Sequence, residues 1–130
     1  MKISIHRHSI WPALGAALLL VSLVPGAALA GDAAAGKTIF DTNCSSCHGP
    51  LGKGDGPVGA ALQPPPRDFS VGDFKYDTDG DGETGTEADL ENIITKGAAA
   101  YGGSPLMAPW PMLSADDVAN VIAYVRTLKQ

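Results

Sequence analysis

The sequence has few histidines, cysteines and methionines, the residues that supply nitrogen and sulfur ligands to metals. Its 130 residues include three histidines, two cysteines and three methionines. Two of the histidines and one of the methionines lie within the first 30 residues, so the rest of the chain has one histidine and two methionines. A structural zinc site needs four ligands, and so short a supply of donors excludes most ligand sets. It also leaves no spare histidine for general acid–base catalysis.

The first 30 residues have the form of a cleavable signal peptide. Lys2 and Arg7 precede an uncharged run over residues 9–31, whose middle is rich in Leu, Ala and Val. A Pro-Gly pair breaks the run, and the segment ends on the small-x-small triplet Ala-Leu-Ala. These features predict cleavage after Ala30, a periplasmic location and one mature domain over residues 31–130. An uncleaved membrane anchor is the alternative, because the uncharged run is long enough to span a bilayer.

Basic residues are also scarce after residue 30. All fourteen acidic residues lie there against seven basic ones, which gives the mature chain a net charge of −7. This charge argues against nucleic acid or an anionic membrane as the partner. It favours protein partners with a basic docking face.

The mature chain has no internal repeat and lacks the alternation that is typical of strands. Helices are predicted over 32–43, 86–97 and 114–129, and the last two begin with the capping-box pattern. The segments 49–72 and 98–113 are rich in Gly and Pro and are expected to be loops. We therefore expect an all-α domain of three to four short helices. So small a helical core gives only marginal stability without a disulfide, a metal or a bound ligand. A large apolar ligand would also explain the long loops.

A C-x-x-C-H motif carries the chemistry. It consists of Cys44, Cys47 and His48 and matches the attachment signal of haem c. On one helical turn, both thiols can reach the vinyl groups of one macrocycle while the histidine faces the iron. The motif predicts one covalent haem with His48 as an axial ligand. A thioredoxin-like pair needs a β-α-β frame, a zinc site needs a fourth ligand, and a disulfide would leave the histidine unexplained.

The sixth iron ligand is predicted by elimination. The mature chain has no second histidine, so the candidates are Met107 and Met112. Met107 lies in an extended loop whose shape is held by prolines, and we expect it to bind the iron. Met112 lies two residues before the cap of the last helix and is expected to pack in the core. Iron with an open sixth position is the alternative.

Together these features resemble the class I cytochromes c, and in particular their small bacterial periplasmic members. The resemblance rests on the motif after a helix with Gly36 and Phe40, on the Met-Ala-Pro-Trp run at 107–110, and on a last helix that contains Tyr124. It covers the whole mature chain. It implies the cytochrome c fold, in which helices surround one covalent haem and the first and last helices cross near Gly36, Phe40 and Tyr124.

The resemblance also implies two contacts around the haem. In the family, a proline carbonyl accepts the proton on the distal ring nitrogen of the haem histidine, and Pro57 is the nearest match here. Arg67, in a Pro-Pro-Arg-Asp-Phe run, is a candidate partner of a haem propionate. A surface arginine bonded to Asp68 or to water is the alternative. The lysine-rich docking ring of the mitochondrial members is missing.

An acidic loop over residues 77–85 matches the opening of a calcium loop. Asp77, Asp79 and Asp81 alternate with single residues and are followed by a glycine. Position twelve should be a glutamate but is Ala88, between two acidic residues, so the bidentate ligand is out of register. We interpret the loop as an acidic, solvated turn, with a weak calcium site as the alternative.

These predictions lead to a function. Haem iron with two strong axial ligands has no open position for a substrate. We therefore predict an electron carrier between redox proteins, and not an enzyme. An open sixth position would instead give a haem-binding sensor or a weak peroxidase. A haem subunit fixed in a larger oxidase or reductase is a further alternative.

Overall fold

The computed structural model describes residues 30–130, so the predicted signal peptide lies outside it except for Ala30. The helices are α1 (Ala33–Asn43), α2 (Ser45–His48), α3 (Glu87–Lys96) and α4 (Ala115–Thr127), with 3-10 turns η1 (Gly59–Ala61) and η2 (Ala98–Tyr101). Residues 30–130 contain no strand, which confirms the all-α class. They also contain no helix that is long and apolar enough to cross a membrane.

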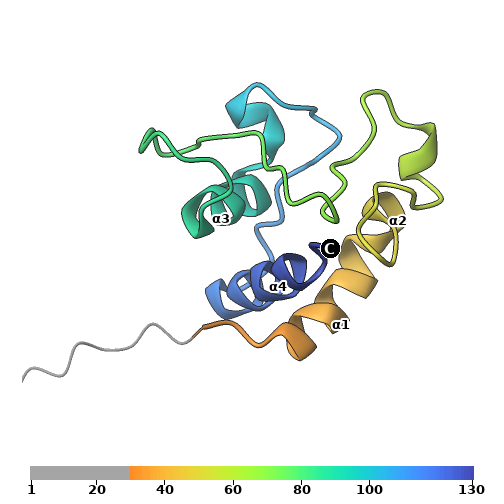
Figure 1. The fold of residues 1–130 in the computed structure, drawn as a ribbon, viewed down its shortest axis with the longest axis horizontal. Coiled ribbons are helices and arrows are strands. Elements are labelled where there is room, and N and C mark those ends of the chain that lie inside the picture. The colour runs from red at the N-terminus through yellow and green to blue at the C-terminus, as the bar shows by residue number, and fades with distance from the viewer. Residues whose placement is uncertain (1–29) are drawn as a thin grey trace, which may run out of the picture.

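Helices α1 and α4 cross at close range. Figure 1 shows this pair on one side of the molecule, with α3 and the long loops on the other. The approach depends on Gly36, because a Cβ atom there would overlap the backbone oxygen of Asn120 in α4. Phe40 is 1% exposed and packs edge-on against Tyr124, with ring centroids 5.2 Å apart. The expected crossing at Gly36, Phe40 and Tyr124 is confirmed.

The helix starts follow from local side-chain caps. Thr86 and Asp89 form a capping box at α3, and Ser114 and Asp117 form one at α4. In each box the two side chains satisfy two N–H groups that a helix start leaves without a partner. At α1, the Asp32 carboxylate accepts two N–H groups of the first turn. The predicted starts of these three helices are therefore confirmed.

A second apolar cluster joins α3 to α4. It consists of Leu90 from α3 with Val118 and Ile122 from α4, and Leu113 packs against it. The apolar residues of α4 are thus buried against two partners, α1 and α3. This arrangement fixes the positions of the helices that line the functional site.

The segment 98–113 was expected to be a loop throughout. The structure differs, because η2 occupies its first residues. Three consecutive alanines favour a helical turn. Gly102 ends the turn with a positive φ of 77°. The remainder of the segment is the Pro-rich stretch that carries Met107.

Candidate functional site

A cavity of about 590 Å³ lies between the helices and the long loops. Its wall contains Cys44, Cys47, His48 and Met107. The rest of the wall is mostly apolar and draws on all four α-helices. A cavity of this size with a few convergent polar groups is typical of a cofactor site. The structure therefore brings together the four residues predicted to bind a haem and its iron.

The motif occupies one helical turn because α2 begins where α1 ends. The Cys44 N–H donates to the Phe40 carbonyl (2.8 Å), and the Cys44 carbonyl accepts the His48 N–H (2.9 Å). The loop after the motif returns close to α2, and a Cβ atom at Gly59 would overlap the Cys47 carbonyl oxygen. The motif turn is therefore held by α1 before it and by the returning loop after it.

The alternatives to haem attachment find no support in the geometry. Cys44 and Cys47 are free thiols. Burial, with a smaller effect of Cys47, raises the pKa of the Cys44 thiol to about 11. A thioredoxin-like pair needs a lowered thiol pKa and a β-α-β frame, and the described part of the chain has no strand. The candidate metal-ligand group found within it consists of three aspartates, not of the motif residues.

His48 is held by the backbone of a distant loop. Its Nδ1 atom lies 3.2 Å from the carbonyl oxygen of Arg67. Burial lowers the pKa of His48 below 6.5, and this hydrogen bond opposes the shift only in part. The ring is therefore neutral at neutral pH, and we assign the proton to Nδ1. That tautomer leaves the Nε2 lone pair for a metal.

The acceptor implied by the family resemblance, the Pro57 carbonyl, is wrong. After His48 the chain turns back through a hydrogen bond from the Gly54 N–H to the His48 carbonyl (2.7 Å), and Pro57 is exposed. The loop returns to the imidazole only at Arg67. The number of residues between His48 and the acceptor does not predict where the loop comes back to the imidazole, because surface loops tolerate insertions and deletions.

Arg67 lines the cavity, and its side chain faces Asp73. Its Nη1 lies 3.7 Å from Asp73 Oδ2, and the two side chains are 35% and 78% exposed. Asp68, the alternative partner, instead accepts hydrogen bonds from the Ser70 N–H and hydroxyl. An ion pair so exposed contributes little. The contact of Arg67 with a propionate stays a prediction.

The two methionines lie in different environments. Met107 is half-buried in the cavity wall, and its carbonyl accepts the Ala98 N–H (3.0 Å) while its N–H donates to Ser104 (3.2 Å). Met112 is 72% exposed and does not line the cavity. The prediction that Met112 packs in the core is wrong, because the adjacent Leu113 takes the core position.

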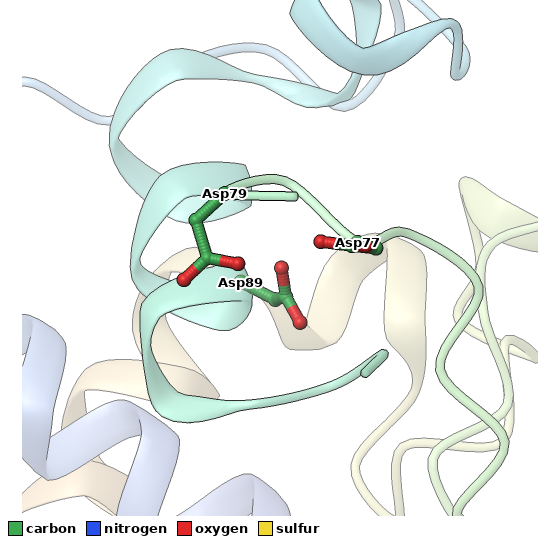
Figure 2. Close-up of side chains that lie close together, drawn as sticks. All are labelled: Asp77, Asp79 and Asp89. Carbon is green, nitrogen blue, oxygen red and sulfur yellow. The ribbon is translucent and has the colours of Figure 1, made fainter. Parts of the chain in front are cut away.

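The acidic loop brings Asp77 and Asp79 together with Asp89, as Figure 2 shows. Asp81 does not belong to this group. One carboxylate oxygen of each lies within 4.8 Å of the others. Both oxygens of Asp77 accept backbone N–H groups of glycines in the loop, at 2.7 and 3.0 Å. Asp81 accepts the N–H of Glu83 at 2.8 Å. The loop thus closes on its own hydrogen bonds.

Asp89 anchors this loop to the start of α3. Its carboxylate is 1% exposed and accepts the N–H and hydroxyl of Thr78 (2.5 and 2.8 Å) and of Thr86 (2.9 and 3.0 Å). Burial by itself would raise the pKa of Asp89, but these four hydrogen bonds lower it to about 2. The carboxylate is therefore charged at neutral pH, with its oxygens already occupied.

We expect cations to affect the acidic loop only by screening its charges, without a specific binding site. Calcium, magnesium and sodium at matched ionic strength should raise the melting temperature of the holoprotein equally, because hydrogen bonds within the protein already engage Asp77 and Asp89. A larger rise with millimolar calcium would contradict this and indicate a site. That rise should then disappear in Asp77→Asn/Asp79→Asn and persist in the matched Asp41→Asn/Asp116→Asn control.

Several aromatic residues of the cavity, among them Tyr76, have no role predicted from the sequence. Phe69 and Phe74 both line it. Phe69 stacks on the His48 ring, with centroids 4.6 Å apart and an angle of 19° between the planes. A sequence signal could have identified these residues. A loop rich in Gly and Pro has no core of its own, so a large aromatic residue within it is buried only if the loop wraps around an apolar ligand.

The residues of the cavity fit a covalently bound haem. The two free thiols lie on one helical turn, as attachment to two vinyl groups requires. His48 leaves its Nε2 free for a metal, and Met107, which carries the candidate thioether ligand, belongs to the wall of the same cavity. The remaining wall is apolar enough to cover a macrocycle.

Sequence comparisons agree with this site. The model of the Cytochrome c family matches residues 33–129. Cytochrome c-554(547) of Halothiobacillus neapolitanus is 38% identical over 103 residues, which cover 77% of this chain and 100% of that protein. Cytochrome c6 of Rippkaea orientalis is 37% identical over 105 residues, which cover 81% of this chain and 78% of that protein.

The fold is also similar to a solved structure. A chain of the reducing HAO-like protein complex of Kuenenia stuttgartiensis matches with a TM-score of 0.61 and 30% identity. The match covers 73% of this chain and 41% of that one, so the chain spans less than half of that protein. The family match extends over almost the whole described range and includes the motif, both crossing helices and the cavity wall. The chain belongs to the cytochrome c family, as a class I, mono-haem electron carrier.

Proposed function

We propose that this protein is a periplasmic one-electron carrier whose haem iron is held by His48 and Met107. The observation that carries the proposal is that the wall of one cavity includes both motif cysteines, His48 with its Nδ1 engaged, and Met107. If His48 and Met107 both bind the iron, no coordination position is left for a substrate, which favours a carrier over an enzyme. The periplasmic location rests on the signal-peptide pattern of the first 30 residues.

The chain's own residues keep the site rigid. When bound, the haem supplies the iron that changes charge. His48 is fixed through Nδ1 by the Arg67 carbonyl, and Met107 is fixed by backbone hydrogen bonds to Ala98 and Ser104. Ligands on such restrained segments move little when the charge changes, as a carrier requires.

The spectrum and redox titration of the wild-type holoprotein test the proposal. We expect a reversible one-electron transition and, in the oxidised form, the weak near-infrared band of methionine ligation to iron(III). Methionine should also hold the potential above that of a bis-histidine haem. A high-spin spectrum with rapid binding of cyanide or carbon monoxide would indicate the open sixth position of a sensor or peroxidase.

A haem subunit fixed in a larger assembly is a second candidate. It is favoured by the similarity to one part of a longer chain in a protein complex. Elution of the native protein from a periplasmic extract at the mass of a large assembly would support this candidate, whereas elution at the mass of one mature chain would support a free carrier.

The distribution of charge supports a partner with a basic docking face. Residues 77–91 contain seven acidic and no basic residues, whereas the rest of the mature chain has seven of each. The whole net charge of −7 therefore lies in this acidic segment. Six of its carboxylates are exposed, and Gly85, Asp89 and Leu90 of the same segment line the cavity. A cationic partner would thus be steered to a face that borders the site.

Small redox reagents of opposite charge test this docking surface. Oxidation of the reduced protein by a cationic cobalt(III) tris-phenanthroline should slow as salt rises, because screening shortens the range of attraction, whereas oxidation by anionic ferricyanide should accelerate. Glu87→Gln/Glu91→Gln should slow the cationic reagent more than the equally charged Asp41→Asn/Asp116→Asn control. Equal effects of the two double variants would contradict a localised acidic docking face.

A further inference from the structure

One short segment, residues 67–70, contacts the His48 imidazole in two different ways. The Arg67 carbonyl oxygen lies 3.2 Å from Nδ1. Two residues later, the Phe69 ring stacks on the imidazole at 4.6 Å, with the planes 19° apart. A hydrogen bond fixes one direction within the imidazole plane, and a stacked ring restricts rotation of the plane about that direction. The two contacts together determine the orientation of the imidazole.

The segment is itself held on several sides. The Phe69 N–H donates to the Gly52 carbonyl (2.7 Å), and the Ser70 carbonyl accepts the Gln130 N–H (3.0 Å). Asp68 accepts the N–H and the hydroxyl of Ser70, at 2.8 and 2.6 Å. These bonds tie the loop to the turn after the motif and to the C-terminus. The backbone that carries Phe69 is therefore restrained independently of His48.

The ring of Phe69 is also packed by other aromatic residues. Phe40 meets it edge-on at 6.3 Å and 66°, and Phe74 lies 6.2 Å away at 27°. Phe40 in turn packs on Tyr124 of α4. The plane of Phe69 is thus set by the core between α1 and α4, which links that core to the orientation of His48.

We propose that Phe69 is a positioning residue that sets the plane of the His48 imidazole, while the Arg67 carbonyl sets its direction. This inference rests on the proposed ligation of the iron by His48. A metal-bound histidine is oriented by the groups around it, and those groups tune the metal. In oxidised low-spin haem, the orientation of the ligand plane determines how unpaired spin is distributed over the macrocycle, and the order and spread of the shifted haem-methyl resonances report it.

Proton NMR of the oxidised holoprotein tests the proposal. Phe69→Leu removes the stacking ring and should change the order or spread of the haem-methyl resonances. Phe69→Tyr keeps the ring and should retain the wild-type pattern. Val118→Ala is the matched stability control, because Val118 is buried in the cluster between α3 and α4 and does not line the cavity. It should lower the melting temperature without changing the pattern.

Each outcome separates this inference from the proposed function. A wild-type pattern in Phe69→Leu overturns the positioning role and leaves the His48 ligation intact. The same change in Val118→Ala would also overturn it, because the shift would then report general loosening of the core. A wild-type holoprotein whose spectrum lacks histidine ligation would overturn the proposed function itself, before any variant is compared.

Discussion

Acid acetone should extract essentially all the haem from the Cys44→Ala/Cys47→Ala protein and none from the wild type. The wild-type mass should exceed that of the apo-chain by one haem. The reason is that the motif thiols are free and line the cavity, so that both can form thioethers with one macrocycle. Without them the haem is held by its axial ligands alone, and acid protonates a histidine ligand. Ser45→Ala/Ser46→Ala, between the cysteines, is the control and should keep the haem.

The same double variant should lose its fixed tertiary structure once the haem is removed. A cavity of about 590 Å³, at roughly 24 cal/mol per Å³, would cost on the order of 14 kcal/mol if it stayed open. This cost is comparable with the whole stability of a small domain, about 5–15 kcal/mol. The haem-free chain should therefore lose its near-ultraviolet circular dichroism. Release of haem from the wild type, or a haem-free variant with native near-ultraviolet dichroism, would contradict these expectations.

Met107→Ala should abolish the near-infrared methionine band and lower the midpoint potential on the order of 0.1 V, since axial ligation and its surroundings set haem potentials over about 0.8 V. Met107 is the methionine of the cavity wall, and its backbone bonds to Ala98 and Ser104 hold the loop in place. The loss should also open the sixth position to cyanide. Absorption spectra and a potentiometric titration measure all three effects.

Met112→Ala is the natural control for this variant. Its side chain is exposed and lies off the cavity wall, so the band and the potential should be retained. The reverse pattern, with the band lost only in Met112→Ala, would move the ligand to Met112. Retention of the band in both single variants would show that neither methionine is required for it.

Features that depend on neighbouring residues could be predicted from the sequence. The starts of α3 and α4 follow from Thr86 with Asp89 and Ser114 with Asp117, because each cap needs only residues within four positions. The motif is equally local, since one helical turn carries both thiols and His48. Gly36 is a further local signal in the sequence, because glycine inside a helix is unfavourable unless another backbone approaches it, and in the structure the backbone of α4 does so.

Contacts made by the long loops could not be predicted in this way. The acceptor of the His48 proton is Arg67 and not Pro57, the third member of the aspartate cluster is Asp89 and not Asp81, and Met112 lies outside the core. Each of these depends on where a Gly/Pro-rich segment returns after leaving a helix, and no short-range pattern records that path.

The sequence by itself therefore determined the helices and the attachment motif. It also reduced the candidates for the sixth iron ligand to two methionines. Only the tertiary structure decided which methionine lines the cavity, which carbonyl holds His48 and which ring stacks on it. The physical reason is the range of the interactions: caps and motifs act over a few residues, whereas the packing of Phe69 between His48, Phe40 and Phe74 forms only when the loop and both crossing helices have come together.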